Sequence, residues 1–244
     1  MSPARVSIVA SFLLFGACAH AQDSQAHAPT SAQQRGDVRE VPDFNEVAVS
    51  HGIRAEVKVG PKSVRLEGPA ELVSRIKLEV EDDGTLHTRV DKKTFSGFRG
   101  GNVRLYVSSP RVEGISASGG SHVEAEATRA DDFDVEASGG AIVTVRGVDA
   151  RKVEAEASGG SQVTLAGRAT EFDVEASGGS AVRALDVKGV KTLDAEASGG
   201  SRVEVDASER ATGEASGGSI LQLVSRPGQS DVRTSGGSRL IYKD

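Results

Sequence analysis

The stretch that decides the fold is EASGGS, at Glu156–Ser161. Identical or closely similar copies begin at six further positions: Ser116, Glu136, Glu175, Glu196, Glu214 and Arg233. The first serines of successive SGG units are separated by 18 to 21 residues. A nearly constant period of this length is typical of stacked repeats, in which each unit buries its apolar side against its neighbours.

Apolar and polar residues alternate on both sides of each SGG unit. Three residues before the first serine most copies carry Val, Ala or Gly, as at Val135, and five residues after it they carry Val or Leu, as at Val143. Such alternation is typical of strands with one buried face. The copies differ in length only away from SGG, for instance at Gly167–Thr170. We therefore expect a constant corner at SGG and a variable turn opposite it.

The pattern predicts an all-β fold, and two arrangements of strands fit it. In a β-helix, the two glycines permit a tight corner, and stacked serines form hydrogen bonds along the axis. An antiparallel meander with Gly-Gly hairpin turns would have the same period. The β-helix pairs each residue with one about 20 positions later, whereas the meander pairs residues across each SGG turn.

Four segments are expected along the chain. They are a signal peptide at 1–21, a disordered linker rich in Ala, Gln and Ser at 22–40, a β-rich N-terminal part at 41–114, and the SGG-repeat β-helix at 115–244. Within the third segment, Asp82-Asp83-Gly84 between two alternating runs predicts a hairpin. A short helix is expected near Pro69–Arg75.

The N-terminus carries an export signal. The apolar run Val6–Ala17 is too short to span a bilayer as a stable helix. Small residues in Ala19-His20-Ala21 predict cleavage before Gln22, whereas the alternative is a lipobox in which Cys18 bears the lipid. We expect an exported protein of the periplasm, the outer membrane or the cell surface. If the lipobox interpretation is correct, a lipid anchor at Cys18 would attach the protein to the membrane; otherwise we expect no membrane attachment.

Composition and motifs restrict the function classes. The net charge is −6, and we find no concentrated basic patch of the kind that binds nucleic acid. The glycine-rich corners lack the Lys-Ser/Thr of a phosphate-binding loop, and the five histidines have no metal-ligand spacing. Phe133 and Phe172 recur in phase with the repeat, which favours core packing over sugar stacking. We expect no cofactor and no nucleic-acid partner.

Acidic residues recur in phase with the repeat. One set stands two residues before the first serine of its unit: Glu136, Glu156, Glu175, Glu196 and Glu214. A second set stands four residues before it: Asp134, Glu154, Asp173, Asp194 and Asp231. In a parallel stack these residues would form columns of like charge. Two interpretations stay open, namely a solvated face that keeps strand edges soluble, and a surface that binds calcium weakly between coils.

The order of motifs resembles a known family. The segments that carry the resemblance are Pro42–Ser50, Arg54–Val59, Val64–Gly68, Asp83–Leu86 and Asn102–Val107, followed by the SGG units. This series is similar to the exported bacterial family called putative auto-transporter adhesin, head GIN domain. The resemblance implies a right-handed single-stranded β-helix (solenoid) with coils of about 20 residues, preceded by a non-repetitive β-rich portion. It also implies an adhesin-like role, and it supplies no catalytic residues.

The sequence thus predicts a non-enzymatic scaffold or adhesin-like binding protein of the cell envelope. Its expected partner is a polysaccharide, another protein or a cell surface. The alternative is a carbohydrate-active enzyme, either a polysaccharide lyase or a hydrolase, because such enzymes also use β-helices. The carboxylates recur at equivalent positions in successive copies, which favours the scaffold over a unique catalytic constellation.

Overall fold

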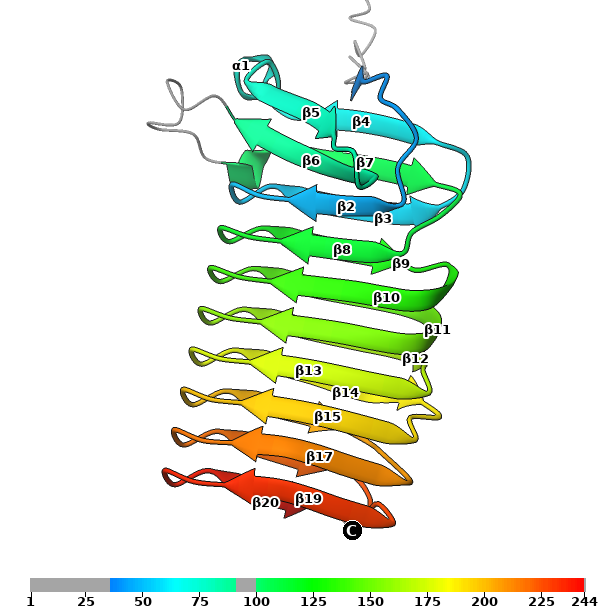
Figure 1. The fold of residues 1–244 in the computed structure, drawn as a ribbon. Coiled ribbons are helices and arrows are strands. Elements are labelled where there is room, and N and C mark those ends of the chain that lie inside the picture. The colour runs from blue at the N-terminus through cyan, green and yellow to red at the C-terminus, as the bar shows by residue number, and fades with distance from the viewer. Residues whose placement is uncertain (1–35, 91–99, 244) are drawn as a thin grey trace, which may run out of the picture. The chain divides into compact units, whose positions relative to one another are not determined.

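The computed structural model describes residues 36–90 and 100–243, which all belong to one compact unit (Figure 1). The predicted signal peptide, most of the predicted linker, and Cys18 lie outside the described residues. Of the helices in the described part of the chain, none has the length and apolar character needed to cross a bilayer.

The chain winds through two stacks of strands that meet at the SGG corners. The first stack contains the strands that lead into the corners, in spatial order β5 (Ile76–Val80), β6 (Thr85–Val90), β2 (Glu46–Val49), β8 (Gly114–Ala117), β10 (Arg129–Ala137), the second part of β11 (Ile142–Ala157), β13 (Glu171–Ala176), β15 (Thr192–Ala197), β17 (Arg210–Ala215) and β19 (Gln229–Thr234).

The second stack contains mainly the strands that leave the corners. In spatial order it consists of β1 (Asp37–Val38), β4 (Ser63–Glu67), β7 (Arg104–Ser109), β3 (Arg54–Val59), β9 (His122–Glu126), the first part of β11, β12 (Gln162–Arg168), β14 (Ala181–Lys188), β16 (Arg202–Val205), β18 (Ile220–Leu223) and β20 (Arg239–Tyr242). Two short helical segments complete the elements, α1 (Ala70–Val73) and the 3-10 turn η1 (Gly100–Asn102).

The pairing decides between the two predicted arrangements. Val143 lies beside Val163, and Glu136 lies beside Glu156, in parallel register. Every pairing from β8 onward is parallel and joins residues one coil apart. The predicted solenoid with coils of about 20 residues is therefore confirmed, and the meander is excluded.

The stack does not follow chain order at its N-terminal end. Strands β2 and β3 lie between the coil of β6 and β7 and the coil of β8 and β9. The solenoid therefore begins with β2 and is not confined to residues after Gly114. Beyond β6 and β7 the pairing becomes antiparallel, with β5 on β6 and β4 on β7. These antiparallel strands and α1 end the regular stack, as terminal capping units do in other solenoids (Figure 1).

Several local predictions are confirmed, and one needs correction. The hairpin at Asp82-Asp83-Gly84 joins β5 to β6, and α1 lies within the predicted helical segment. The predicted linker extends too far, because Asp37–Val38 forms β1 on the edge of β4. The open backbone of an edge strand can pair with a segment that has no apolar periodicity. Strand β7 starts at Arg104 because Gly100–Asn102 forms a 3-10 turn.

The two glycines of each corner have different physical roles. Both have positive φ, for example 64° at Gly178 and 79° at Gly179. A Cβ atom at Gly178 would lie 3.0 Å from the backbone nitrogen of Gly159 in the preceding coil, whereas one at Gly179 would meet no atom within 4 Å. The first glycine thus allows close stacking of the corners, and the second supplies only the backbone angle.

The hydrogen bonds expected between stacked serines have a different acceptor. The last serine of an SGGS unit is buried, and its hydroxyl donates to a backbone carbonyl of the preceding coil. These pairs are Ser161 to Ala137, Ser180 to Ala157, Ser201 to Ala176 and Ser219 to Ala197, all at 2.9 Å. Each bond adds a link along the axis between coils.

The core between the stacks is thin because small side chains fill it. Inward positions beside the corners carry mostly Ala and Val, such as Ala155 and Val163, with exposures of 1% and 0%. Phe133 and Phe172 are fully buried, so the predicted core role is confirmed. Outward positions alternate with these along each strand. The alternation leaves columns of outward side chains on the outside of each stack.

The different roles of the corner glycines can be tested with one pair of variants. Gly179→Ala should destabilise the fold by about 1 kcal/mol, because alanine is strained at positive φ. Gly178→Ala should destabilise it by at least about 2 kcal/mol, because its Cβ also meets the backbone of the preceding coil. Chemical denaturation measures both changes. Equal effects of the two variants would contradict the proposed close approach at the first glycine.

Candidate functional site

Carboxylates line the outer side of the first stack in two columns. The parallel register places the predicted residues beside one another in the order Glu136, Glu156, Glu175, Glu196 and Glu214. The neighbouring column contains Asp134, Glu154, Asp173 and Asp194. This column then continues through Thr212 to Asp231. Adjacent strands are about 4.8 Å apart, so the carboxylates form a dense ladder. We call these two columns the acidic face.

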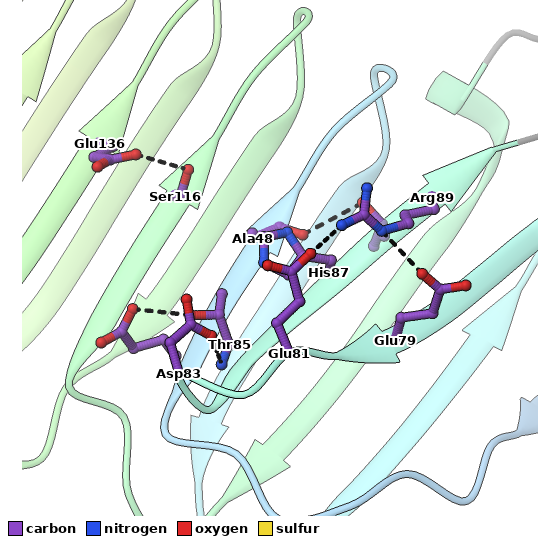
Figure 2. Close-up of polar contacts among 11 residues, drawn as sticks. Ala48, Glu79, Glu81, Asp83, Thr85, His87, Arg89, Ser116 and Glu136 are labelled. Atoms are coloured by element: carbon purple, nitrogen blue, oxygen red, sulfur yellow. Dashed lines mark hydrogen bonds and ion pairs between the residues drawn. The ribbon is translucent and has the colours of Figure 1, made fainter. Parts of the chain in front are cut away.

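The acidic face leads into a groove at its N-terminal end. The column of glutamates continues from Glu136 to Ser116, Ala48 and His87 on neighbouring strands (Figure 2). Ser116 and Ala48 have short side chains, whereas longer side chains stand on either side of them. The result is a groove of about 320 Å³. It lies where short side chains interrupt the column of glutamates, next to the β5–β6 hairpin.

Gly114 contributes to the same groove by leaving space for an acid. In the neighbouring column it lies between Glu46 and Asp134. A Cβ atom at Gly114 would lie 2.9 Å from the side chain of Glu46. The Glu46 carboxylate instead accepts a hydrogen bond of 3.2 Å from the hydroxyl of Thr85. Glycine at this position thus lets Glu46 lie against the β5–β6 hairpin.

The β5–β6 hairpin forms the other wall of the groove. Its side chains there include Glu81, Asp83 and His87 (Figure 2). Arg89 forms ion pairs with Glu81 and with Glu79, the latter at 3.0 Å. One oxygen of Asp83 accepts a hydrogen bond of 2.9 Å from the backbone N–H of Thr85. The wall is therefore a set of polar side chains held by neighbours on the same hairpin.

The carboxylates of the acidic face and the groove oppose one another's ionisation. Partial burial is the main cause that raises the pKa of Glu156, and the carboxylates of Glu136 and Glu175 add to it. Burial also raises the pKa of Asp134 and of Glu46, and neighbouring acids reinforce both shifts. In contrast, the backbone hydrogen bond from Thr85 lowers the pKa of Asp83. The surface is thus short of positive charge.

Basic residues at the margin of the acidic face compensate part of its charge, and at its C-terminal end Arg233 pairs with Glu214 at 3.5 Å. Lys152 forms ion pairs with Glu154 and with Asp173, the latter at 2.8 Å, and the hydrogen bonds that it donates to these two acids raise its pKa. Arg151 pairs with Asp132 at 2.6 Å and with Glu171 at 2.9 Å. Lys152 and Arg151 lie on one strand, β11. Among the described residues, no basic side chain forms an ion pair with Glu156, Glu175 or Glu196.

The outer side of the second stack has a different character. Its columns mix residue types, and Glu204, for instance, lies between Arg183 and Gln222. A groove of about 360 Å³ on this side is lined by basic, acidic and aromatic side chains, including Arg54, Glu124 and Tyr106. Continuous columns of carboxylates are therefore a property of the first stack in the described part of the chain.

The sequence located the glutamate column but not the groove. The five predicted glutamates do form one column, as a parallel register requires. The sequence does not predict Glu81, Asp83 and His87 as a group, because the spacing of the histidines alone does not reveal a ligand set that includes carboxylates. The predicted hairpin was the available signal, since residues on its two arms and its turn must lie close together.

A family model described as putative auto-transporter adhesin, head GIN domain, matches residues 43–227. The chain belongs to this family. The sequence resemblance is therefore confirmed, and the match includes the groove and most of the acidic face. No curated protein matches the chain significantly.

Solved structures share the solenoid fold. A putative adhesin from Bacteroides fragilis has a TM-score of 0.78 and 20% identity, over 85% of this chain and 95% of that one. A putative lipid binding protein from Parabacteroides distasonis has a TM-score of 0.62 and 14% identity, over the same shares of the two chains. A putative adhesin from Parabacteroides merdae has a TM-score of 0.56 and 11% identity, again over 85% and 95%. At these identities the likeness concerns the fold alone.

Repulsion within the glutamate column predicts a stabilising substitution. Glu156→Gln should raise the free energy of unfolding at pH 7 by about 0.5 kcal/mol, because like charges on adjacent strands destabilise a sheet. The pKa of Glu156 is higher in the folded state than its ordinary value. Its penalty is therefore complete above the folded pKa and disappears below about pH 4.5, where the folded and unfolded chains are both protonated.

Thermal melting of the unmodified protein and of Glu156→Gln, between about pH 4.5 and pH 7, measures the difference in stability. Glu204→Gln is the matched control, because its register neighbours are Arg183 and Gln222 and not acids. It should not raise the melting temperature at pH 7. A Glu156→Gln protein that is less stable than the unmodified protein at pH 7 would contradict the repulsion argument.

Proposed function

We propose that this protein is an exported, non-enzymatic, adhesin-like scaffold of the bacterial cell envelope, and that the acidic face is its binding surface. Membership of the adhesin family and the likeness to putative adhesins support the general role. The observation that carries the choice of surface is the register of the carboxylates, which repeats the same charge in successive coils.

A periodic surface suits a partner that is itself periodic. Each coil offers only a weak electrostatic contact, because exposed charges interact weakly in water. Many such contacts on one rigid stack act together, since after the first contact the others form at a high effective concentration. We therefore propose a polymeric cell-surface partner, with cationic groups that contact the carboxylates directly or anionic groups that calcium ions bridge to them.

The same periodicity argues against the enzymatic alternative. General acid and base catalysis needs carboxylates in different environments, so that one is protonated while the other is ionised. Glu156 and Glu175 have acidic neighbours in the same register on both sides. Such equivalence favours repeated binding over a single reaction centre.

Calcium is the simplest cation for this surface. Hard cations prefer several oxygen ligands, and adjacent strands present carboxylates from both columns. Exposure to solvent makes each site weak, because each ion keeps part of its hydration and the ligands are only partly ordered. The glutamates proposed to contribute are those of the column: Glu136, Glu156, Glu175, Glu196 and Glu214.

Binding and catalysis can be separated with defined polysaccharides. Immobilised protein should retain cationic chitosan, should not retain its neutral N-acetylated form, and should retain polygalacturonate only when calcium is present. The triple variant Glu156→Gln, Glu175→Gln, Glu196→Gln should reduce retention by about tenfold, because three charge contacts together contribute roughly 1.4 kcal/mol. Glu124→Gln, Glu126→Gln, Glu204→Gln on the second stack is the matched control and should retain both polymers.

The same incubations test the alternative that the protein is a carbohydrate-active enzyme. Release of new reducing or unsaturated ends would overturn the non-enzymatic proposal. Equal retention by the two triple variants would show that the acidic face is not the binding surface.

Calcium binding itself has a separate test. Calcium chloride should raise the melting temperature of the protein by several degrees more than sodium chloride of equal ionic strength, because an ion bound only by the folded state stabilises it. The rise should be smaller for the Glu156, Glu175, Glu196 triple variant. A melting temperature that responds equally to the two salts would exclude calcium from this surface.

A further inference from the structure

Three potential metal ligands meet on the β5–β6 hairpin at the end of the groove. Glu81 and Asp83 belong to its turn, and His87 follows on β6. One ligand atom from each side chain lies within 4.8 Å of the other two. The group combines one imidazole with two carboxylates, so it differs in kind from the all-carboxylate columns of the acidic face.

The imidazole of His87 supplies an independent observation. Its Nε2 atom is shielded from solvent, although 28% of the side chain is exposed, and it has no hydrogen-bond partner among the described residues. The nearest acidic atom in the ion pair is Oε2 of Glu81, at 3.5 Å. An N–H···O hydrogen bond is ordinarily about 2.7–3.2 Å long. A buried ring nitrogen without a partner is uncommon and calls for a physical explanation.

The spacing between these two atoms suits a shared metal ion. Zinc lies about 2.0–2.1 Å from histidine nitrogen and carboxylate oxygen, and its usual geometry is tetrahedral. Two ligands of one tetrahedral zinc are therefore about 3.3 Å apart. The separation of 3.5 Å between Nε2 of His87 and Oε2 of Glu81 is close to this value. An ion placed between them would satisfy both atoms.

One neighbouring side chain and one backbone N–H group already orient the two carboxylates. Arg89 contacts Oε1 of Glu81, which leaves Oε2 of Glu81 on the side of His87 (Figure 2). The backbone N–H of Thr85 holds Oδ1 of Asp83 at 2.9 Å. Such outer contacts reduce the ordering required when a metal binds, and they commonly accompany ligands in established sites.

We propose that Glu81, Asp83 and His87 bind one divalent transition-metal ion, for which zinc is the natural probe. Imidazole suits zinc and related ions, whereas calcium and magnesium prefer oxygen ligands alone. The three side chains supply three donor atoms, so a further position is left for water or for a donor atom of a bound molecule. The opening of this site into the groove places that position beside the acidic face.

Calorimetric titration of the full chain with zinc chloride tests the site. The unmodified protein, after removal of metals by a chelator, should show a high-affinity event that the His87→Gln protein lacks. We expect His87→Gln to weaken this event by about 100-fold, because changes to outer contacts alone commonly weaken metal binding by roughly 10–100-fold. Glu81→Gln and Asp83→Asn should weaken it as well.

Two matched variants separate a metal site from general electrostatics. Glu79→Gln removes a neighbouring charge on the same hairpin that pairs with Arg89, and His122→Gln removes a histidine from the groove on the second stack. Both should retain the high-affinity zinc event. Zinc should also raise the melting temperature of the unmodified protein and of both controls, but not that of His87→Gln. A cooperative melting transition of His87→Gln without zinc verifies that this variant folds.

Equal zinc affinity for the unmodified protein and the His87→Gln protein would overturn the proposal. So would the absence of a stoichiometric zinc event in the unmodified protein, or a calcium affinity at this site as high as that for zinc. These outcomes leave the adhesin-like function of the acidic face unaffected, because none of its glutamates is changed in the experiment.

Discussion

The close approach of successive glycine corners is the constraint on which the rest of the structure depends. At Gly178 the backbone of one coil lies so near that of the next that a Cβ atom would meet it at 3.0 Å. This contact recurs at the following corners, for example at 2.9 Å for Gly199. Because the corners stack at a constant distance, the residues next to them pair in exact register on both sides. In the first stack this register is carried along the strands, whereas in the second stack it shifts farther from the corner, between Val145 and Val148 and between Thr164 and Ala166.

Exact register has an electrostatic consequence on the outside of the first stack. Any residue type that repeats with the period becomes a column, and here the repeated type is a carboxylate. The pKa of Glu156 is raised by burial and by its acidic neighbours, which shows that this arrangement opposes its own charge. The hydrogen bonds of the buried serine hydroxyls and the continuous apolar core stabilise the stack of coils against this repulsion. The cations and cationic partners proposed above would reduce this repulsion.

The groove depends on positions at which the column of glutamates is interrupted. Where Ser116 and Ala48 replace glutamate in the column, the surface becomes hollow, and His87 lies at its far side. The groove and the proposed metal ligands therefore occur where the regular coils meet the antiparallel cap. The same column presents repeated acids over the coils and a distinct group of polar side chains at the cap.

The sequence by itself determined the period, the corner, the inward and outward positions, the hairpin of Asp82-Asp83-Gly84 and the membership of the glutamate column, because these depend on spacing along the chain. Only the tertiary structure decided that coils pair in parallel and that β2 and β3 lie between β6–β7 and β8–β9. That order brings residues 85–87, 46–48 and 114–116 side by side. No local pattern encodes it, since pairing of distant strands depends on backbone hydrogen bonds and shared burial, which become specific only when the whole stack has formed.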